Sequence, residues 1–173
     1  CGVEVQGLEH VPAAGPLILA GNHVSLVDGP LLAVALWPHR YLISMGKAEL
    51  YSIPVFGWFL RNAGTIPLDR RGDVSGMRAA LDVLAAGGCI GMFPEGTRSK
   101  DGNPAIPRAG VGFLAAHSKA AVVPARLINT ERFPWARPLK VKFGPPIHFE
   151  GPDDSRAAYA AFARDVMSRV FSL

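Results

Sequence analysis

The chain has 173 residues, enough for one domain with a sizeable core, and 49% of them are hydrophobic. Lysine and arginine outnumber aspartate and glutamate by 18 to 14, and the resulting net charge of +4 favours anionic partners. Its two cysteines, Cys1 and Cys89, are too few for a disulfide framework and lie too far apart for a zinc site.

Apolar runs in the sequence are too short to cross a bilayer, and no signal peptide is visible. The stretch PLLAVALWP (30–38) falls far short of the ~20 residues that a spanning helix needs. The chain begins with Cys1 rather than Met, which leaves open a preceding N-terminal membrane anchor. We expect residues 1–173 to form a single domain, with or without that anchor.

Short apolar strands alternate with helical segments along the chain. The first strand covers 16–20, and a helix begins at Asp28, an N-cap type of residue followed by Pro30. Residues 47–64 form a helix that a proline and a glycine interrupt. We expect further strands at 41–45, 65–69, 89–93, 120–128 and 139–143, and further helices at 73–87, 110–118 and 155–171. This alternation predicts an α/β fold, a single three-layer domain whose mixed, largely parallel sheet is flanked by helices.

Three of the predicted strands end in polar clusters: GNHVSLVD (21–28), DRRGD (69–73) and PEGTRSKDG (94–102). Ligands of open α/β sheets bind outside the carboxyl ends of the strands, so the three clusters are expected to meet in one site. The candidate residues of that site are His23, Asp28, Arg70, Arg71, Glu95 and Arg98.

The stretch GNHVSLVDGP (21–30) admits three interpretations. With Ser25 as nucleophile, His23 and Asp28 would complete a hydrolase triad. Without Ser25, a histidine with a pKa near neutrality suits a general base, and a carboxylate on its second nitrogen fixes the tautomer. In the third interpretation, Asp28 merely begins a helix.

Two other enzyme signatures fail on inspection. No serine lies in the G-x-S-x-G elbow of the serine hydrolases. The stretch GVGFLA (110–115) fits a loose dinucleotide pattern, but the two prolines just before it exclude the buried strand that such a loop requires.

Taken together, the motifs resemble those of the glycerophospholipid acyltransferases. The stretch NHVSLVD resembles the H-x-x-x-x-D block of that family, and FPEGTRS (93–99) resembles its third block. Residues 47–70, ending in GTIPLDR, are similar to the second block, and AAVVPARL (120–127) is similar to the fourth. The stretch VKFGPPI (141–147) is similar to a late strand and turn, so the resemblance covers roughly residues 15 to 150 in the family's order.

The resemblance implies a glycerol-3-phosphate acyltransferase-like fold and a direct transfer without an acyl-enzyme. His23 would be the general base and Asp28 its orienting acid. The family's pattern gives the binding of a phosphate-bearing acceptor to Arg70, Glu95, Gly96, Thr97, Arg98 and Arg108. Arg108 stands where the family often has a lysine directly before a glycine, and here an alanine intervenes.

The implied reaction moves a fatty acyl group from acyl-CoA or acyl-carrier protein to lysophosphatidate in phospholipid biosynthesis, with no metal and no cofactor. Glycerol 3-phosphate or another lysolipid is the alternative acceptor. A thioesterase and a non-catalytic phospholipid-binding module are the rival functions. The expected location is the cytoplasmic face of the membrane, peripheral or anchored, and no nucleic acid partner is expected.

Two segments combine aromatic with basic residues. They are YSIPVFGWFL (51–60), flanked by Lys47 and Arg61, and RFPWARPLK (132–140). Such a composition is typical of contact with a lipid surface, although the aromatic residues of the first segment suit a buried core equally well.

Overall fold

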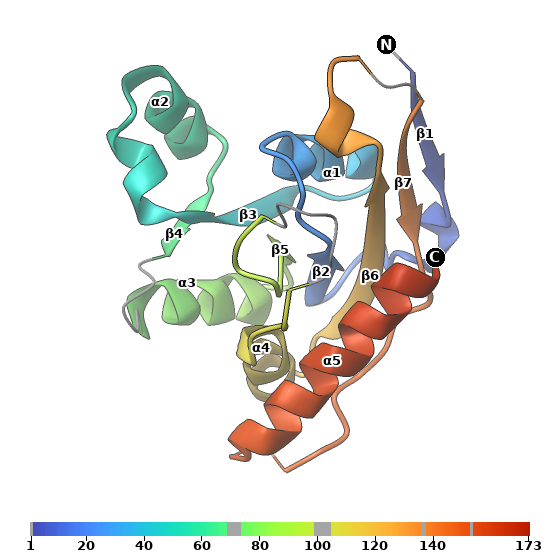
Figure 1. Cartoon of the computed structure of the whole chain (residues 1–173). Helices are drawn as coiled ribbons and strands as arrows, with labels where there is room; N and C mark the ends of the chain where they lie inside the picture. Colours follow the sequence, from blue (N-terminus) through green and yellow to red (C-terminus); the bar gives the residue numbers. More distant parts are fainter. Residues whose placement is uncertain (1, 69–73, 99–104, 136–137, 153) are drawn as a thin grey trace.

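Seven strands form one sheet in the order β1-β7-β6-β2-β5-β3-β4 (Figure 1). The computed structural model describes residues 2–68, 74–98, 105–135, 138–152 and 154–173. Its strands are β1 Val3–Gln6, β2 Leu17–Gly21, β3 Leu42–Lys47, β4 Ile66–Leu68, β5 Cys89–Met92, β6 Ala121–Ile128 and β7 Leu139–Phe143. The five strands from β6 to β4 are parallel, whereas β7 runs antiparallel to β6 and is itself parallel to β1. The sheet is therefore mixed and largely parallel, as the sequence predicts.

Helices cover both faces of the sheet. They are α1 Asp28–Leu36, α2 Pro54–Asn62, α3 Val74–Ala85, α4 Gly110–Ser118 and α5 Arg156–Ser172, with short 3-10 helices η1 Leu8–His10, η2 Ala48–Ser52 and η3 Thr130–Arg132. Helix α1 packs on one face, and α3, α4 and α5 pack on the other. None of the helices in the described ranges has the length and apolarity needed to span a bilayer.

Strand β2 lies at the centre of the core because all five of its residues are buried. Leu17 and Leu19 pack on the α1 side, and Ile18 and Ala20 pack on the side of α3, α4 and α5. Alternate side chains of a strand point to opposite faces, so a continuous apolar run is what a strand covered on both faces requires.

The structure adds one strand to the elements predicted from sequence and corrects two of the predictions. Strand β1 was not predicted, and the segment 47–64 divides into η2 and α2 rather than forming one interrupted helix. Helix α1 does begin at Asp28, but Asp28 is its first helical residue and Val27 holds the N-cap position. The prediction of Asp28 as an N-cap is therefore wrong, because its side chain is engaged elsewhere.

The carboxyl ends of β2, β5 and β6 meet at one edge of the sheet. Ala20 pairs with Met92 on β5, and Gly21 pairs with Ala125 on β6. The loops that leave β2 and β5 therefore start side by side, and they carry the first and third polar clusters of the sequence. The second cluster (69–73) lies outside the described residues.

Candidate functional site

The chain leaves the sheet directly after β2, and the buried side chain of Asn22 holds this exit point. The Leu127 N–H donates to Asn22 Oδ1 at 2.8 Å, and Asn22 Nδ2 donates to the Leu127 carbonyl at 3.0 Å. The last residue pair of the β2–β6 ladder is Gly21 with Ala125, so the amide of Asn22 extends the pairing beyond it. The next residue, His23, is thus anchored to a rigid edge.

The imidazole of His23 contacts the carboxylate of Asp28 across the loop. Nδ1 of His23 lies 2.8 Å from Oδ2 of Asp28. Asp28 is fully buried, whereas the His23 side chain is 21% exposed. The sequence separation of five residues would keep the two apart on a continuous helix, and the turn before α1 brings them together.

Asp28 also organises the loop that carries His23. Its Oδ2 accepts the backbone N–H groups of Val24 and Ser25, each at 2.7 Å, in addition to the contact with His23. The Ser25 hydroxyl accepts a longer hydrogen bond of 3.4 Å from the Val27 N–H, which is a loop-shaping role. Asp28 Oδ1 is buried and has no hydrogen-bond partner.

This hydrogen bonding selects one tautomer of His23. Asp28 Oδ2 already accepts two backbone N–H groups, so it acts as an acceptor toward the imidazole as well. The neutral ring therefore carries its proton on Nδ1, and Nε2 keeps a free lone pair. A histidine in this state can take a proton from a hydroxyl, and the buried carboxylate stabilises the imidazolium that forms.

The turn after β5 supports His23 from the other side. The ring of Phe93 stacks on the His23 imidazole with 4.3 Å between centroids and an interplanar angle of 13°. The buried carboxylate of Glu95 accepts the His23 backbone N–H at 3.0 Å through Oε1. Its Oε2 accepts a longer hydrogen bond of 3.4 Å from the Ala105 N–H. Glu95 thus braces the main chain of His23, and its predicted contact with an acceptor stays a prediction.

Gly96 lies in the same turn, and Arg108, which precedes α4, packs against it. Gly96 has φ +66°, and a Cβ at this position would lie 2.8 Å from Nε of Arg108. The Arg108 N–H donates to the Pro94 carbonyl at 2.8 Å, which ties the arginine to the FPEG turn despite the alanine between Arg108 and Gly110. Only glycine combines this backbone conformation with so close a neighbour.

The structure brings most of the predicted residues together. His23, Asp28, Glu95, Gly96 and Arg108 converge through the contacts above. Thr97 and Arg98 continue the turn and are exposed, as residues that meet a ligand from solvent would be. Arg70 and Arg71 lie outside the described residues.

Sequence reasoning missed three residues that shape the site: Asn22, Phe93 and Arg126. Arg126 is partly buried near Glu95, its guanidinium lies 4.5 Å from the ring centroid of Phe171, and its Nη1 is buried without a hydrogen-bond partner. Burial lowers the pKa of Arg126, and the charges of Glu95 and Glu131 oppose that shift. In the sequence, Arg126 is the single charged residue of the apolar run AVVPARLI, and this exception could have indicated a specific role.

Groupings of three or more His, Cys, Asp or Glu side chains suited to a metal ion do not occur among the described residues. Two shallow grooves border other parts of the surface. One lies beside α1 and β3, and the other lies beside α5, so neither is lined by His23.

The chain is thus an α/β protein with a histidine–carboxylate pair at the carboxyl edge of a largely parallel sheet. The model of the acyltransferase family matches residues 2–128. The chain therefore belongs to the acyltransferase family.

Similar proteins agree with this assignment. A chloroplastic 1-acyl-sn-glycerol-3-phosphate acyltransferase, LPAT1 of Arabidopsis thaliana, is 32% identical over 132 residues, which cover 74% of this chain and 36% of that protein. The 1-acyl-sn-glycerol-3-phosphate acyltransferase of Bacillus subtilis is 30% identical over 152 residues, which cover 85% of this chain and 74% of that protein. The crystal structure of the 1-acyl-sn-glycerophosphate acyltransferase PlsC of Thermotoga maritima superposes with a TM-score of 0.70 at 27% identity, over 96% of this chain and 71% of that one. The chain spans between about a third and about half of the length of its first three curated relatives.

Proposed function

We propose that this chain transfers a fatty acyl group from acyl-CoA or acyl-carrier protein to the free hydroxyl of lysophosphatidate. The observation that carries the proposal is the contact of 2.8 Å between His23 Nδ1 and the buried Asp28 carboxylate. It leaves Nε2 as the basic atom of a partly exposed imidazole. The names of the similar proteins support lysophosphatidate as the first choice of acceptor.

The proposed reaction is a direct transfer. Nε2 of His23 removes the proton of the acceptor hydroxyl while its oxygen attacks the thioester carbonyl carbon. The tetrahedral intermediate collapses with cleavage of the carbon–sulfur bond, and the ester forms. The leaving thiolate takes the proton back from the imidazolium and departs as the free thiol. Asp28 keeps the ring in one tautomer and balances its transient charge.

The phosphate of the acceptor is proposed to bind the FPEGTR turn. The guanidinium groups of Arg98 and Arg108 provide planar forks that match phosphate oxygens, and Thr97 adds a hydroxyl beside them. Gly96 lets an anion approach the backbone. The role of Arg70 in the same task rests on the sequence motif alone.

A thioesterase that uses Ser25 as nucleophile is the weaker rival. The Ser25 hydroxyl accepts a hydrogen bond from the Val27 N–H, so its described contact is within the loop. His23 is held by Asp28 and Glu95 instead. A lipid-binding module without turnover would need the FPEGTR turn but would have no use for the His23–Asp28 pair.

The acceptor and the product are lipids, so we place the reaction at a membrane surface, on the cytoplasmic face. The net charge of +4 supports attraction to anionic lipid. We propose that this chain contacts the membrane peripherally.

Thiol release from an acyl-CoA, measured with and without lysophosphatidate, tests the proposal. We expect release that requires the acceptor, with phosphatidate identified by mass. Equal release without acceptor would establish the thioesterase, and tight lipid binding with no release would establish the module. A panel with glycerol 3-phosphate and other lysolipids then ranks the acceptors.

A further inference from the structure

Exposed tryptophans stand on both sides of the His23 loop. One segment follows the carboxyl end of β3 and includes α2, whose Trp58 is 64% exposed. The other follows β6 and carries Trp135, which is 90% exposed. In the sheet, β2 and β5 lie between β6 and β3, so the two segments flank the loops that hold His23 and Glu95. Figure 1 shows them on the same side of the molecule, on either side of α1.

The backbone fixes the outward direction of Trp58. Gly57 packs directly against the Tyr51 carbonyl of η2, where a Cβ would collide, and Leu60 is buried on the same inner side. Val55 and Trp58 are three residues apart and exposed, so they share the outer face of α2. Rotation of the helix to hide Trp58 would expose Leu60 and break the contact at Gly57.

The loop after β6 presents Trp135 in a similar way. Two turn hydrogen bonds shape it, from Phe133 N to the Thr130 carbonyl at 3.2 Å and from Trp135 N to the Arg132 carbonyl at 2.8 Å. Thr130 is buried and anchors the base of the loop. Phe133 and Trp135 remain exposed beyond it.

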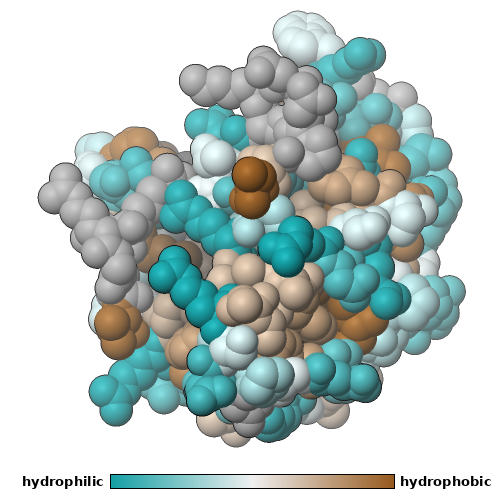
Figure 2. All heavy atoms as spheres, turned by 60° about the horizontal axis from the view of Figure 1, so that its bottom comes forward, coloured by the Kyte–Doolittle hydropathy of each residue, from teal (hydrophilic) through white to brown (hydrophobic). Residues whose placement is uncertain are grey.

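Each tryptophan has an arginine nearby. Arg61 lies one turn from Trp58 and donates to the Tyr51 carbonyl, a neutral acceptor that does not cancel its charge. Arg132 is exposed, and its Nε lies 3.9 Å from Glu131, a long distance for an ion pair. An indole beside a guanidinium suits the boundary between anionic headgroups and acyl chains. Figure 2 shows the face that lies at the bottom of Figure 1, where hydrophilic and apolar side chains are mixed.

We propose that the two aromatic tips, Val55 and Trp58 on one side and Phe133 and Trp135 on the other, dock this chain on an anionic phospholipid bilayer. Contact at two points on opposite flanks of the site turns the His23 loop toward the lipid. The inference rests on the proposed function for its choice of occupant, because a lysolipid acceptor is held in such a surface.

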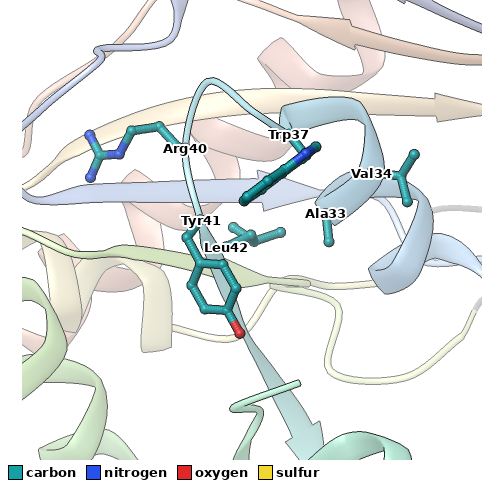
Figure 3. A pocket seen from close by; sticks show the side chains of 6 residues that line it. All are labelled: Ala33, Val34, Trp37, Arg40, Tyr41 and Leu42. Atoms are coloured by element: carbon teal, nitrogen blue, oxygen red, sulfur yellow. The ribbon is translucent and has the colours of Figure 1, made fainter. Parts of the chain in front are cut away.

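Trp37 provides an internal control, since the chain has three tryptophans. It is 68% exposed at the end of α1 and borders an open groove of about 230 Å³ with Val34, Tyr41 and Leu42 (Figure 3). Arg40 in the same turn donates to the carbonyls of Gly15 and Gly87, which lie two residues before the starts of β2 and β5. Trp37 therefore lies at the amino edge of the sheet, away from the two tips.

Three variants that each keep one tryptophan and replace the other two by phenylalanine test the surface. The probe is a vesicle of phosphatidylcholine and phosphatidylglycerol in equal parts, with no lysolipid and no acyl donor. We expect the emission of Trp58 and of Trp135 to shift to shorter wavelength and to be quenched by lipids brominated on the acyl chain. Trp37 should show neither effect. A response from Trp37 alone, or from none of the three, overturns the proposal.

Paired variants separate docking from turnover. Trp58→Ala with Trp135→Ala should weaken vesicle binding at least tenfold and leave turnover of a monomeric short-chain acceptor unchanged, whereas Trp37→Ala should change neither. Undiminished vesicle binding of the double variant would overturn the docking surface while the proposed function stands. Vesicle binding by a wild-type chain that never acylates any acceptor would overturn the proposed function alone. A spectral response to acyl-carrier protein but not to vesicles would assign the tips to a protein partner and overturn the proposal.

Discussion

The backbone amide of His23 donates to the buried carboxylate of Glu95 at 3.0 Å, across 72 residues of sequence. This bond joins the loop after β2 to the turn after β5.

Glu95→Gln tests this bond. It keeps the shape of the side chain but replaces one carboxylate oxygen by an NH2 group, which would face the Ala105 N–H or the His23 N–H. We expect a loss of roughly 1–3 kcal/mol in the free energy of unfolding, from the unpaired donor. Denaturant unfolding measures it, and an unchanged midpoint would contradict the bracing role.

Asp28→Asn separates the charge of the carboxylate from its geometry. The amide oxygen can still accept the three N–H groups at Oδ2, and the NH2 group occupies the unpartnered Oδ1 position. The tautomer of His23 is therefore retained, but the imidazolium loses its counter-charge. We expect kcat to fall by at least tenfold with KM unchanged, and the buried NH2 group without a partner to lower the free energy of unfolding by roughly 1–3 kcal/mol. Full activity in a folded Asp28→Asn variant would show that orientation alone suffices.

His23→Ala removes the proposed base. General-base catalysis contributes about 10²–10⁴-fold to the rate, and we expect a loss of turnover of that size. Binding of lysophosphatidate, measured by calorimetry, should survive because Arg98 and Arg108 are untouched. Retained turnover would contradict the base assignment, and an acyl label on Ser25 would contradict direct transfer.

Asn22→Ala should release the loop from the sheet. The variant leaves the N–H and the carbonyl of Leu127 without partners in a buried position, which costs roughly 1–3 kcal/mol for each group. We expect a lower Tm and a lower kcat. Asn62→Ala is the matched control, since Asn62 is exposed and donates to the Trp58 carbonyl one turn back. Equal effects of the two substitutions would contradict a positioning role for Asn22.

Gly96→Ala tests the turn beneath Arg108. A side chain at φ +66° costs about 1–3 kcal/mol, and the new Cβ would push the arginine away. We expect a higher KM for the phosphate-bearing acceptor and a smaller effect on the thioester. Gly29→Ala is the control, because nothing lies within 4 Å of a Cβ placed there. If Gly96→Ala leaves the KM for the acceptor unchanged, Arg108 does not bind the acceptor.

Cys89 predicts how stability depends on alkaline pH. Burial raises its pKa from the ordinary 9.0 to about 12. The neutral thiol is thus favoured by folding, so this contribution is present below pH 9 and is lost as pH rises toward 12. Over that window the unfolded chain releases the proton first, and the free energy of unfolding falls by up to ~1.4 kcal/mol per pH unit. Cys89→Ala should flatten the slope relative to the parent protein.

Most of the fold was predictable from sequence because β2, β5 and β6 are apolar runs bounded by glycine and polar residues. Such short runs are typical of strands covered on both faces. Strand β1 was not predicted: Val3–Gln6 does alternate apolar with polar residues, but the run is only four residues long and lies half-exposed at the edge of the sheet. The order of the strands could not be predicted from the pattern of apolar residues, because parallel pairing joins residues far apart in the chain.

The sequence by itself determined the residue types of the site, with a histidine and an aspartate five positions apart and a glycine-containing turn that carries Glu95 and Arg98. Only the tertiary structure decided that Glu95 faces the main chain of His23, that Asp28 turns back to its own loop, and that Asn22 bonds to β6. The Glu95 bond joins two loops, the Asn22 bond joins a loop to β6, and the Asp28 bond closes a loop on itself, each over about 3 Å. Such distances follow from the packing of β2 between β5 and β6, and no local propensity specifies them.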